Sequence, residues 1–317
     1  MSELISNEMK SKEKIELGFS GHETFPFRYT WLKKAVDAVT KDQSTFGQDS
    51  AMVDLGVGKN MVTSMKHWAI LSSLLEEVKD RKIQVSEFGK KLLSDKEGWD
   101  PYLEDIASLW LLHWKISTNL SKATTWYFTF NKLTQIEFTK EQLVYEIGLF
   151  AESNNVRANP SVIARDVDCF IRTYVPSRSA KLGLLEDSLD CPLTELDLIQ
   201  DIGQRGLYVF SRGQQRELPN EVFVYALIEY WKTSGQKTSA LSFEDIAYGA
   251  GSPGLVFKLD EDSLSYRLAA LEKMTRGALS YDETSSLRQV YYHKILNSED
   301  YLEKYFENQM AEISKRS

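Results

Sequence analysis

The sequence predicts a mainly α-helical protein with small β wings, built as an N-terminal winged helix, a central helical region and a C-terminal winged-helix-like module. Apolar residues recur at helical spacing along most of the chain, and in the middle third they include many aromatic residues on shared helix faces. Glycine-rich turns lie at residues 56–58 and 249–254. Each turn precedes an amphipathic helix, and short β-prone segments come after that helix. We therefore place the domains at 1–98, 99–218 and 219–317.

The first domain is predicted to hold three helices, a wing strand and a closing helix. Their expected bounds are Tyr29 to Val39, Asp49 to Leu55, a helix beginning at Lys59, a strand from Ile83 to Val85, and a helix from Val85 to Leu93. A helix, a short helix, a tight turn and an amphipathic helix form the plan of a helix-turn-helix, whose second helix enters the major groove of DNA. Residues 25–95 are therefore predicted to form a winged helix.

The helix that follows Gly58 has two distinct faces. Its apolar face is formed by Met61, Met65, Trp68, Ser72 and Leu75. Donors for phosphates and base edges lie on its first turn and its opposite face, and these predicted DNA-binding residues are Lys59, Asn60, Thr63, Lys66 and His67. Periodicity alone is equally compatible with an ordinary amphipathic helix whose basic face is solvated.

A nucleotide-binding loop is the other function that the segment LGVGKN suggests. A P-loop needs a glycine five residues before its Gly-Lys pair and a Ser or Thr directly after it. Val53 and Asn60 occupy those two positions, and no third glycine follows Gly58 at the spacing of a dinucleotide-binding fingerprint. The sequence therefore argues against a phosphate-cradling loop here.

The central region is predicted to form helices with defined starts. Asp100-Pro101 is expected to open one helix, Thr139 with Gln142 forms a capping box for another, and Asn159-Pro160 caps a third. Residues 176–219 are expected to be a loop-rich connection. His113 lies on an apolar stripe, which favours a hydrogen-bonded core histidine over a metal ligand.

The last domain repeats the plan of the first without detectable sequence similarity. Its expected elements are helices over Val222 to Trp231 and Phe243 to Tyr248, a helix striped by Leu264, Leu268 and Leu271, and a hairpin of Ala278 to Tyr281 with Leu287 to Tyr292. Carboxylates that would repel phosphate stand where DNA would approach, at Asp260, Glu261, Asp262, Asp282 and Glu283. We therefore predict a protein contact, as a homodimer or with a modification partner, through Ser263, Tyr266, Arg267, Ala270 and Lys273.

Composition predicts a globular, cytoplasmic protein. The chain is 42% hydrophobic, yet no stretch approaches the roughly 20 apolar residues of a membrane span, and the charged N-terminus lacks the apolar core of a signal peptide. Cys169 and Cys191 have neither disulfide-framework nor zinc spacing, so we expect both to be reduced and structural.

Because the chain has a net charge of −8, any DNA site must be a local basic patch. One such patch comprises Lys59, Lys66, Lys79, Arg81, Lys82, Lys90, Lys91 and Lys96.

One compact polar cluster offers groups that could act in catalysis. In FSGHETFPFRYTWLKK, the candidate catalytic residues His22, Glu23 and Arg28 supply a general base, a metal-binding or orienting carboxylate, and a phosphate clamp. The alternative is that Glu23 pairs with Arg28 while His22 bonds a loop carbonyl, which would lock the N-terminal arm onto the first domain. An acidic group at Glu186, Asp187 and Asp190 could hold Mg²⁺, although a solvated loop is the commoner meaning of such a run.

Four longer segments, taken in order, resemble a known bacterial family. They are GHETFPFRYTWLKK, LGVGKNMVTSMKHWA, DPYLEDIASLWLLHW and RDVDCFIRTYV. The chain is similar over residues 19–257 to a domain family of otherwise undefined function. That family includes the nickase component of the single-strand DNA phosphorothioation system, a phage-defence system that replaces a non-bridging phosphate oxygen with sulfur.

The resemblance implies a DNA nickase, dependent on Mg²⁺ or Mn²⁺, that acts beside a cysteine desulfurase, an ATPase and a sulfur transferase. It does not identify the residues that cut DNA or the target sequence. Two classes of function therefore stay open: a metal-dependent nicking endonuclease, and a non-catalytic DNA-binding adaptor or transcriptional regulator.

Overall fold

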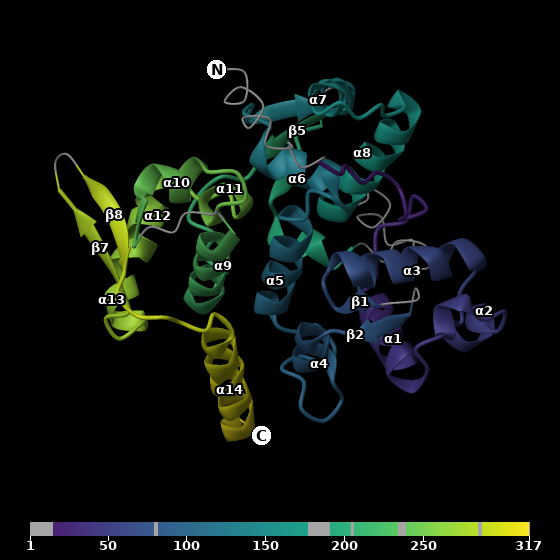
Figure 1. Cartoon of the computed structure of the whole chain (residues 1–317), viewed down its shortest axis with the longest axis horizontal. Coiled ribbons are helices and arrows are strands. Elements are labelled where there is room, and N and C mark those ends of the chain that lie inside the picture. The colour runs from purple at the N-terminus through teal and green to yellow at the C-terminus, as the bar shows by residue number, and fades with distance from the viewer. Residues whose placement is uncertain are drawn as a thin grey trace, which may run out of the picture.

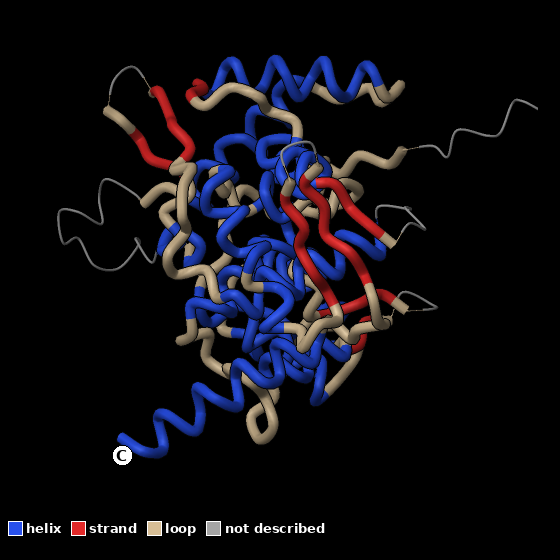
Figure 2. Tube along the Cα trace, turned by 90° about the vertical axis from the view of Figure 1, so that its left-hand side faces the viewer, coloured by secondary structure: helices blue, strands red, loops and turns tan. Residues whose placement is uncertain are grey.

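The computed structural model describes residues 15–78, 82–176, 191–203, 206–233, 239–284 and 287–316. Within these ranges the protein is mainly helical and has small antiparallel sheets, which confirms the predicted class. Figure 1 shows the N-terminal helices at one end of the molecule and the β7–β8 hairpin at the other. Figure 2 shows the strands as short segments on a largely helical body.

The N-terminal elements follow the predicted order closely. They are α1 (Tyr29–Lys41), η1 (Thr45–Gly47), α2 (Ala51–Leu55), α3 (Lys59–Leu71), β1 (Leu75–Glu77), β2 (Ile83–Val85) and α4 (Glu87–Leu93). Strands β1 and β2 pair antiparallel, with Leu75 opposite Val85. Ser86 caps helix α4, because its side chain accepts a hydrogen bond from the Gly89 N–H. The helix therefore begins at Glu87, two residues later than predicted.

The central elements are α5 (Ile106–Ser117), α6 (Thr124–Asn131), β3 (Glu137–Thr139), α7 (Lys140–Ser153), α8 (Pro160–Tyr174), η4 (Pro192–Leu196), β4 (Ile199–Asp201) and β5 (Leu207–Phe210). The predicted caps at Thr139 and Asn159 are confirmed, because each side chain accepts from a backbone N–H of its helix. The predicted helix start at Asp100-Pro101 is wrong. The Asp100 carboxylate instead accepts from the Glu104 and Asp105 N–H groups, and Asp105 caps α5.

The C-terminal elements are α9 (Asn220–Thr233), β6 (Ala240–Ser242), α10 (Phe243–Tyr248), α11 (Pro253–Val256), α12 (Glu261–Ala269), α13 (Leu271–Met274), β7 (Leu279–Glu283), β8 (Arg288–Tyr292) and α14 (Glu299–Arg316). The predicted hairpin is present as β7 and β8, and β6 adds a third strand that the sequence did not suggest. Arg267, expected on an exposed face, is buried, since its guanidinium donates to Asn220 Oδ1 and to the carbonyls of Gln214 and Gln215.

A continuous hydrophobic core runs through the three predicted domains. Trp68 of α3 packs edge-on against Trp126 of α6, and Phe257 packs against Trp110 of α5. His113 is fully buried, and its nitrogens lie 2.8 Å from the Tyr174 hydroxyl and the Val256 carbonyl oxygen. It is the hydrogen-bonded core histidine that its position predicted. Because buried contacts join the three regions, each one depends on its neighbours for part of its core.

Both cysteines are buried. Burial raises the pKa of the Cys169 thiol well above its ordinary value, so this thiol stays protonated and packs as a small apolar group. Among the helices that the structure describes, none combines the length and the apolar character needed to cross a membrane.

Candidate nucleic-acid interface

Helix α3 presents an uncapped N-terminus to solvent. Its N-cap is Gly58, which has no side chain to accept from the first N–H groups, and both Lys59 and Asn60 are exposed. The first turn of an α-helix has N–H groups without intrahelical acceptors, and the helix dipole places partial positive charge there. Such a terminus attracts anions, phosphate groups included.

The predicted outer face of α3 is only partly exposed. Thr63 is exposed, whereas Lys66 and His67 are half-buried. The prediction that His67 faces outward with the lysines is wrong. Its ring packs on Gly21, where an added Cβ would lie 2.5 Å from Nδ1, and its centroid lies 6.1 Å from that of His22.

The electrostatic character of His67 follows from this packing. Burial, assisted by the nearby His22 and Lys122, lowers the pKa of His67 to about 4. The ring is therefore neutral at neutral pH. It can exchange hydrogen bonds with a ligand but adds no positive charge to the basic patch.

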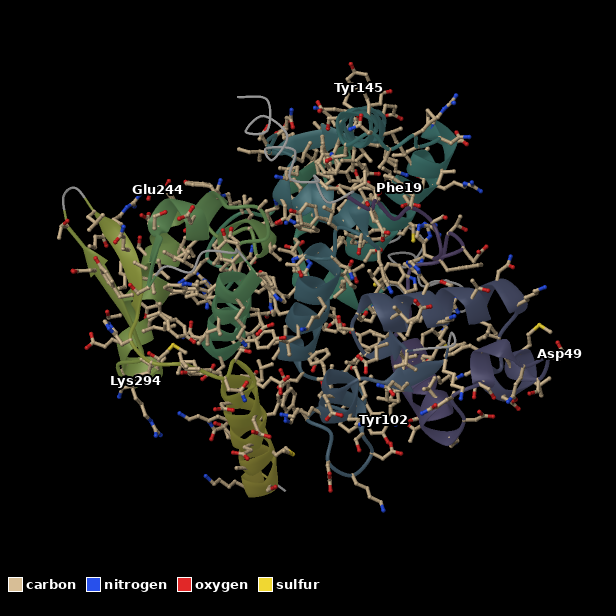
Figure 3. The ribbon with its side chains drawn as sticks, viewed as in Figure 1. Phe19, Asp49, Tyr102, Tyr145, Glu244 and Lys294 are labelled. Atoms are coloured by element: carbon tan, nitrogen blue, oxygen red, sulfur yellow. The ribbon has the colours of Figure 1, made fainter. Side chains whose placement is uncertain are left out.

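A pocket of about 430 Å³ lies between α3, the N-terminal arm (residues 18–21) and the segment before α6. Lys66 and Lys122 approach the same carboxylate of Glu77, at 3.8 and 3.6 Å, so two lysines share one acid at the rim. Figure 3 shows Phe19 of the arm in the upper part of the molecule and Asp49 at the end where α2 lies. The pocket thus opens beside the helix that carries most of the predicted DNA-binding residues.

The loop at residues 20–24 has an unusual backbone that several contacts hold in place. Ser20, Gly21, Glu23 and Thr24 all have positive φ, which non-glycine residues adopt at a cost. From α3, the Ser64 hydroxyl donates to the His22 carbonyl at 2.8 Å and the Trp68 indole donates to the Phe25 carbonyl at 2.7 Å. On the other side, Arg172 of α8 donates to the Thr24 carbonyl.

A buried histidine–aspartate pair anchors this loop. His22 is 2% exposed, and its Nε2 lies 2.9 Å from Asp166 Oδ1 on α8. The same oxygen accepts from the Ser20 N–H at 2.8 Å, and His22 Nδ1 accepts from the Thr24 N–H at 3.0 Å. Since Nδ1 is an acceptor, the ring carries its proton on Nε2 and donates it to the carboxylate. Both nitrogens are therefore occupied within the protein.

The predicted cluster of His22, Glu23 and Arg28 is not assembled as a unit. Glu23 is exposed, while the Arg28 guanidinium lies 5.8 Å from the centre of the Trp31 ring. Within the described ranges no ion pair joins Glu23 to Arg28, and His22 bonds a carboxylate rather than a loop carbonyl, so the expected locking contacts were the wrong ones. The arm is nevertheless locked, through Asp166.

Asp166 is the residue that sequence reasoning missed. It is 1% exposed and lies on the buried side of α8 with Ile163 and Phe170. An acidic residue on the apolar stripe of an amphipathic helix is a signal for a buried polar contact, because an ionised carboxylate is seldom buried without a partner. The segment RDVDCFIRTYV carried that signal, but its partner lies 144 residues away.

The basic patch is thinner than its sequence suggested. Lys90 and Lys91 pair with Glu87 at 2.7 Å and Glu299 at 2.9 Å. Lys79 and Arg81 lie outside the described residues. Lys59, Lys82 and Lys96 remain as exposed cations, and Lys59 lies at the start of α3.

A resident divalent metal does not fit the side chains seen here. Across the described part of the chain, no group of three or more His, Cys, Asp or Glu residues is placed to hold a metal ion. The acidic group at Glu186, Asp187 and Asp190 falls outside the described residues. The Asp166 carboxylate is buried and already accepts hydrogen bonds from two N–H groups.

Comparison with known proteins identifies the family. The family described as "Protein of unknown function (DUF4007)" matches residues 19–306. The chain belongs to this family. Two solved structures are also similar over most of their length. One, "Magnesium ion-bound SspB crystal structure", is 30% identical with a TM-score of 0.81, covering 92% of this chain and 88% of its own. The other, "SspB crystal structure", is 28% identical with the same TM-score, covering 93% and 90%.

The family match agrees with the resemblance found in the sequence motifs. One of the two SspB structures contains magnesium. A search of curated proteins gives no significant match.

Proposed function

We propose that this protein is a DNA-binding component of a phosphorothioation-based phage-defence system and that α3 is its DNA-contacting helix. One observation supports the DNA contact above the others: α3 begins at an uncapped glycine with Lys59 and Asn60 exposed beside its free N–H groups. Phosphate can accept hydrogen bonds from these groups and pair with the lysine. Similarity to SspB supports the system.

The order of the N-terminal elements supports a winged-helix interpretation. Helices α1, α2 and α3 are followed by the β1–β2 hairpin, and Lys66 of α3 lies 3.8 Å from Glu77 at the end of β1. In this arrangement the recognition helix would present its N-terminal residues to the major groove while the hairpin acts as the wing. Half-buried His67 would contribute a neutral hydrogen-bonding group beside Thr63.

The DNA contact can be tested by the salt dependence of binding. Each phosphate contact adds about one unit to the slope of log affinity against log salt, so Lys59→Ala/Lys66→Ala should lower the slope by about two. A matched control, Lys140→Ala/Lys304→Ala, removes two lysines from α7 and α14 and should leave the slope unchanged. Equal slopes for wild type and the α3 double variant would remove α3 from the interface.

The family resemblance adds nicking to this proposal, with His22, Glu23 and Arg28 near the scissile phosphate. In this arrangement Glu23 would be the exposed carboxylate, and His22, held by Asp166, would position the loop. A non-catalytic adaptor is the second candidate, because both nitrogens of His22 are occupied within the protein. Either protein would work beside the desulfurase, ATPase and sulfur transferase of the system.

Supercoiled plasmid separates the two candidates. A nickase would convert it to the relaxed form with Mg²⁺ or Mn²⁺, EDTA would stop the conversion, and Glu23→Gln would lower the rate without changing DNA affinity. Glu16→Gln, which changes another exposed carboxylate in the segment before α1, is the control. Plasmid that is bound but stays supercoiled in every condition would establish the adaptor.

A further inference from the structure

A second pocket lies where the central and C-terminal elements meet. It encloses about 260 Å³ and is lined by the segment after α6 (residues 131–136), the end of β5, and residues of α10 and α11. Figure 1 shows α11 beside α6 at this junction. None of the residues proposed to contact DNA lines it, so an inference from this pocket is independent of the DNA-binding proposal.

Lys258 is the most unusual residue of this pocket. Its side chain is almost fully buried, and its ammonium donates to the Phe130 carbonyl at 2.9 Å and lies 4.0 Å from the centre of the Phe210 ring. No carboxylate within the described ranges pairs with it. An ammonium group has three donors, so two of its N–H groups have no acceptor among the residues that the structure describes. Burial of a charge without a partner is costly, which makes an external acceptor favourable.

The backbone holds Lys258 in this position. Its φ of 52° lies in the left-handed region, and its carbonyl accepts from the Gly213 N–H at 3.0 Å. The next residue, Leu259, donates its N–H to the Gly254 carbonyl at 3.0 Å. Non-glycine residues in this conformation persist where the surroundings impose it, and they concentrate at binding sites.

Arg212 supplies a second cation to the same pocket. Its Nε donates to the Leu259 carbonyl at 3.1 Å, and its guanidinium lies 5.8 Å from the centre of the Tyr248 ring. It forms no ion pair with any described carboxylate. The nearby Glu261 is engaged by the Tyr248 hydroxyl and by Arg288. The Tyr248 hydroxyl lies within hydrogen-bonding reach of the guanidinium, but no described carboxylate pairs with it, so its charge can still attract an anion.

The charge of the lining contrasts with that of the whole protein. Its charged members are Lys132, Arg212 and Lys258, and no Asp or Glu is among the lining residues. The chain as a whole carries a net charge of −8. Phe210 and Leu255 add apolar surface, and Tyr248 adds an aromatic ring. Cations set among apolar and aromatic groups are suited to a ligand with an anionic end and a flat body.

We propose that this pocket binds the phosphate group of a small molecule the size of a mononucleotide, with Lys258 and Arg212 contacting the phosphate. The volume lies below the roughly 300–1,000 Å³ of typical ligand pockets, which favours a small molecule over a polymer. Burial also lowers the pKa of Lys258 to about 7, assisted by Arg212. A bound phosphate would restore the charged ammonium.

Calorimetric titration of the full-length protein with inorganic phosphate, AMP and adenosine tests the proposal. Phosphate and AMP should bind, and adenosine should not. Tighter binding of AMP than of phosphate would identify a nucleotide as the ligand, and equal binding of the two would identify free phosphate. Arg212→Gln should weaken binding by roughly tenfold or more, because it removes a charge-assisted contact. Arg165→Gln, on the exposed side of α8, should bind like wild type.

A labelling experiment on the wild-type protein avoids any dependence on how variants fold. An amine of lowered pKa reacts readily with acetic anhydride, and phosphate should protect Lys258 from acetylation while leaving exposed Lys273 reactive. Failure of phosphate and AMP to bind, unchanged binding in Arg212→Gln, or equal acetylation of Lys258 with and without phosphate would each overturn the proposal.

Discussion

Replacing Asp166 with alanine should destabilise the protein well beyond the effect of an ordinary surface substitution. The carboxylate is 1% exposed and accepts from the Ser20 N–H at 2.8 Å and from His22 Nε2 at 2.9 Å. Each donor left without a partner costs about 1–3 kcal/mol, and exposed Ser20 lies at the lower end of that range, so we expect a loss of about 3 kcal/mol. For a chain of 317 residues, such a loss lowers Tm by roughly 4–5 °C.

Asp168→Ala is the matched control for this substitution. Asp168 lies on the same helix, but its partner is Lys140 at 2.6 Å and its side chain is 54% exposed. Exposed ion pairs contribute less than about 1 kcal/mol, so this variant should melt within roughly 2 °C of wild type. Thermal unfolding followed by circular dichroism measures both, and Asp166→Asn, which keeps one acceptor oxygen, should fall between them. If the two alanine variants melt alike, the His22–Asp166 pair does not anchor the loop.

Three further predictions follow from the same contacts. Gly21→Ala should lower the free energy of unfolding by about 2 kcal/mol or more, because φ is 92° there and the new Cβ would lie 2.5 Å from His67. Gly148→Ala, inside α7 with open space around it, should instead raise it by about 0.5–1 kcal/mol. Urea denaturation measures both variants, and equal effects would contradict this account. The free energy of unfolding should fall as pH drops from 6.5 towards 4, because burial lowers the pKa of His67 to about 4 and that of His113 to about 3. In this range the unfolded chain binds protons that the folded chain does not. Urea titrations of His67→Asn should show a shallower fall with pH, and an equally steep fall would rule out His67 as a source. The homodimer that the sequence predicts should weaken in Tyr266→Glu, where the ring is 73% exposed on α12, but not in Tyr145→Glu, where the ring is 64% exposed on α7. Sedimentation measures this, and a wild-type protein that is monomeric at every concentration would contradict the homodimer.

The elements that sequence patterns located correctly are those stabilised by near neighbours in the chain. Thr139 caps α7 through the N–H of Gln142, and Asn159 caps α8 through the N–H of Ser161, two or three residues away. Helix α3 begins at Lys59 because Gly58 and the preceding left-handed Gly56 separate it from α2. The prediction at Asp100-Pro101 failed because the carboxylate there caps a turn and a later aspartate begins the helix.

The candidate site depends instead on contacts between segments that are far apart in the sequence. His22 was recognised as chemically interesting, but its partner Asp166 lies 144 residues away, so no local pattern linked them. His67 was placed on an outward face by helical periodicity, yet the arm packs against it and leaves it half-buried. Periodicity shows which way a side chain points on its own helix and contains no information about what later packs against that side.

The sequence by itself therefore determined the helical class, most helix limits, the capping residues and the family, since helix formation depends on residues three or four apart and family motifs are runs of sequence. Only the tertiary structure decided the His22–Asp166 anchor, the burial of Arg267 and the cationic pocket around Lys258. Each of these joins segments that are distant in the chain. Their energies come from desolvation and from hydrogen bonds that exist only after the core has assembled, and desolvation depends on everything that surrounds a group in space.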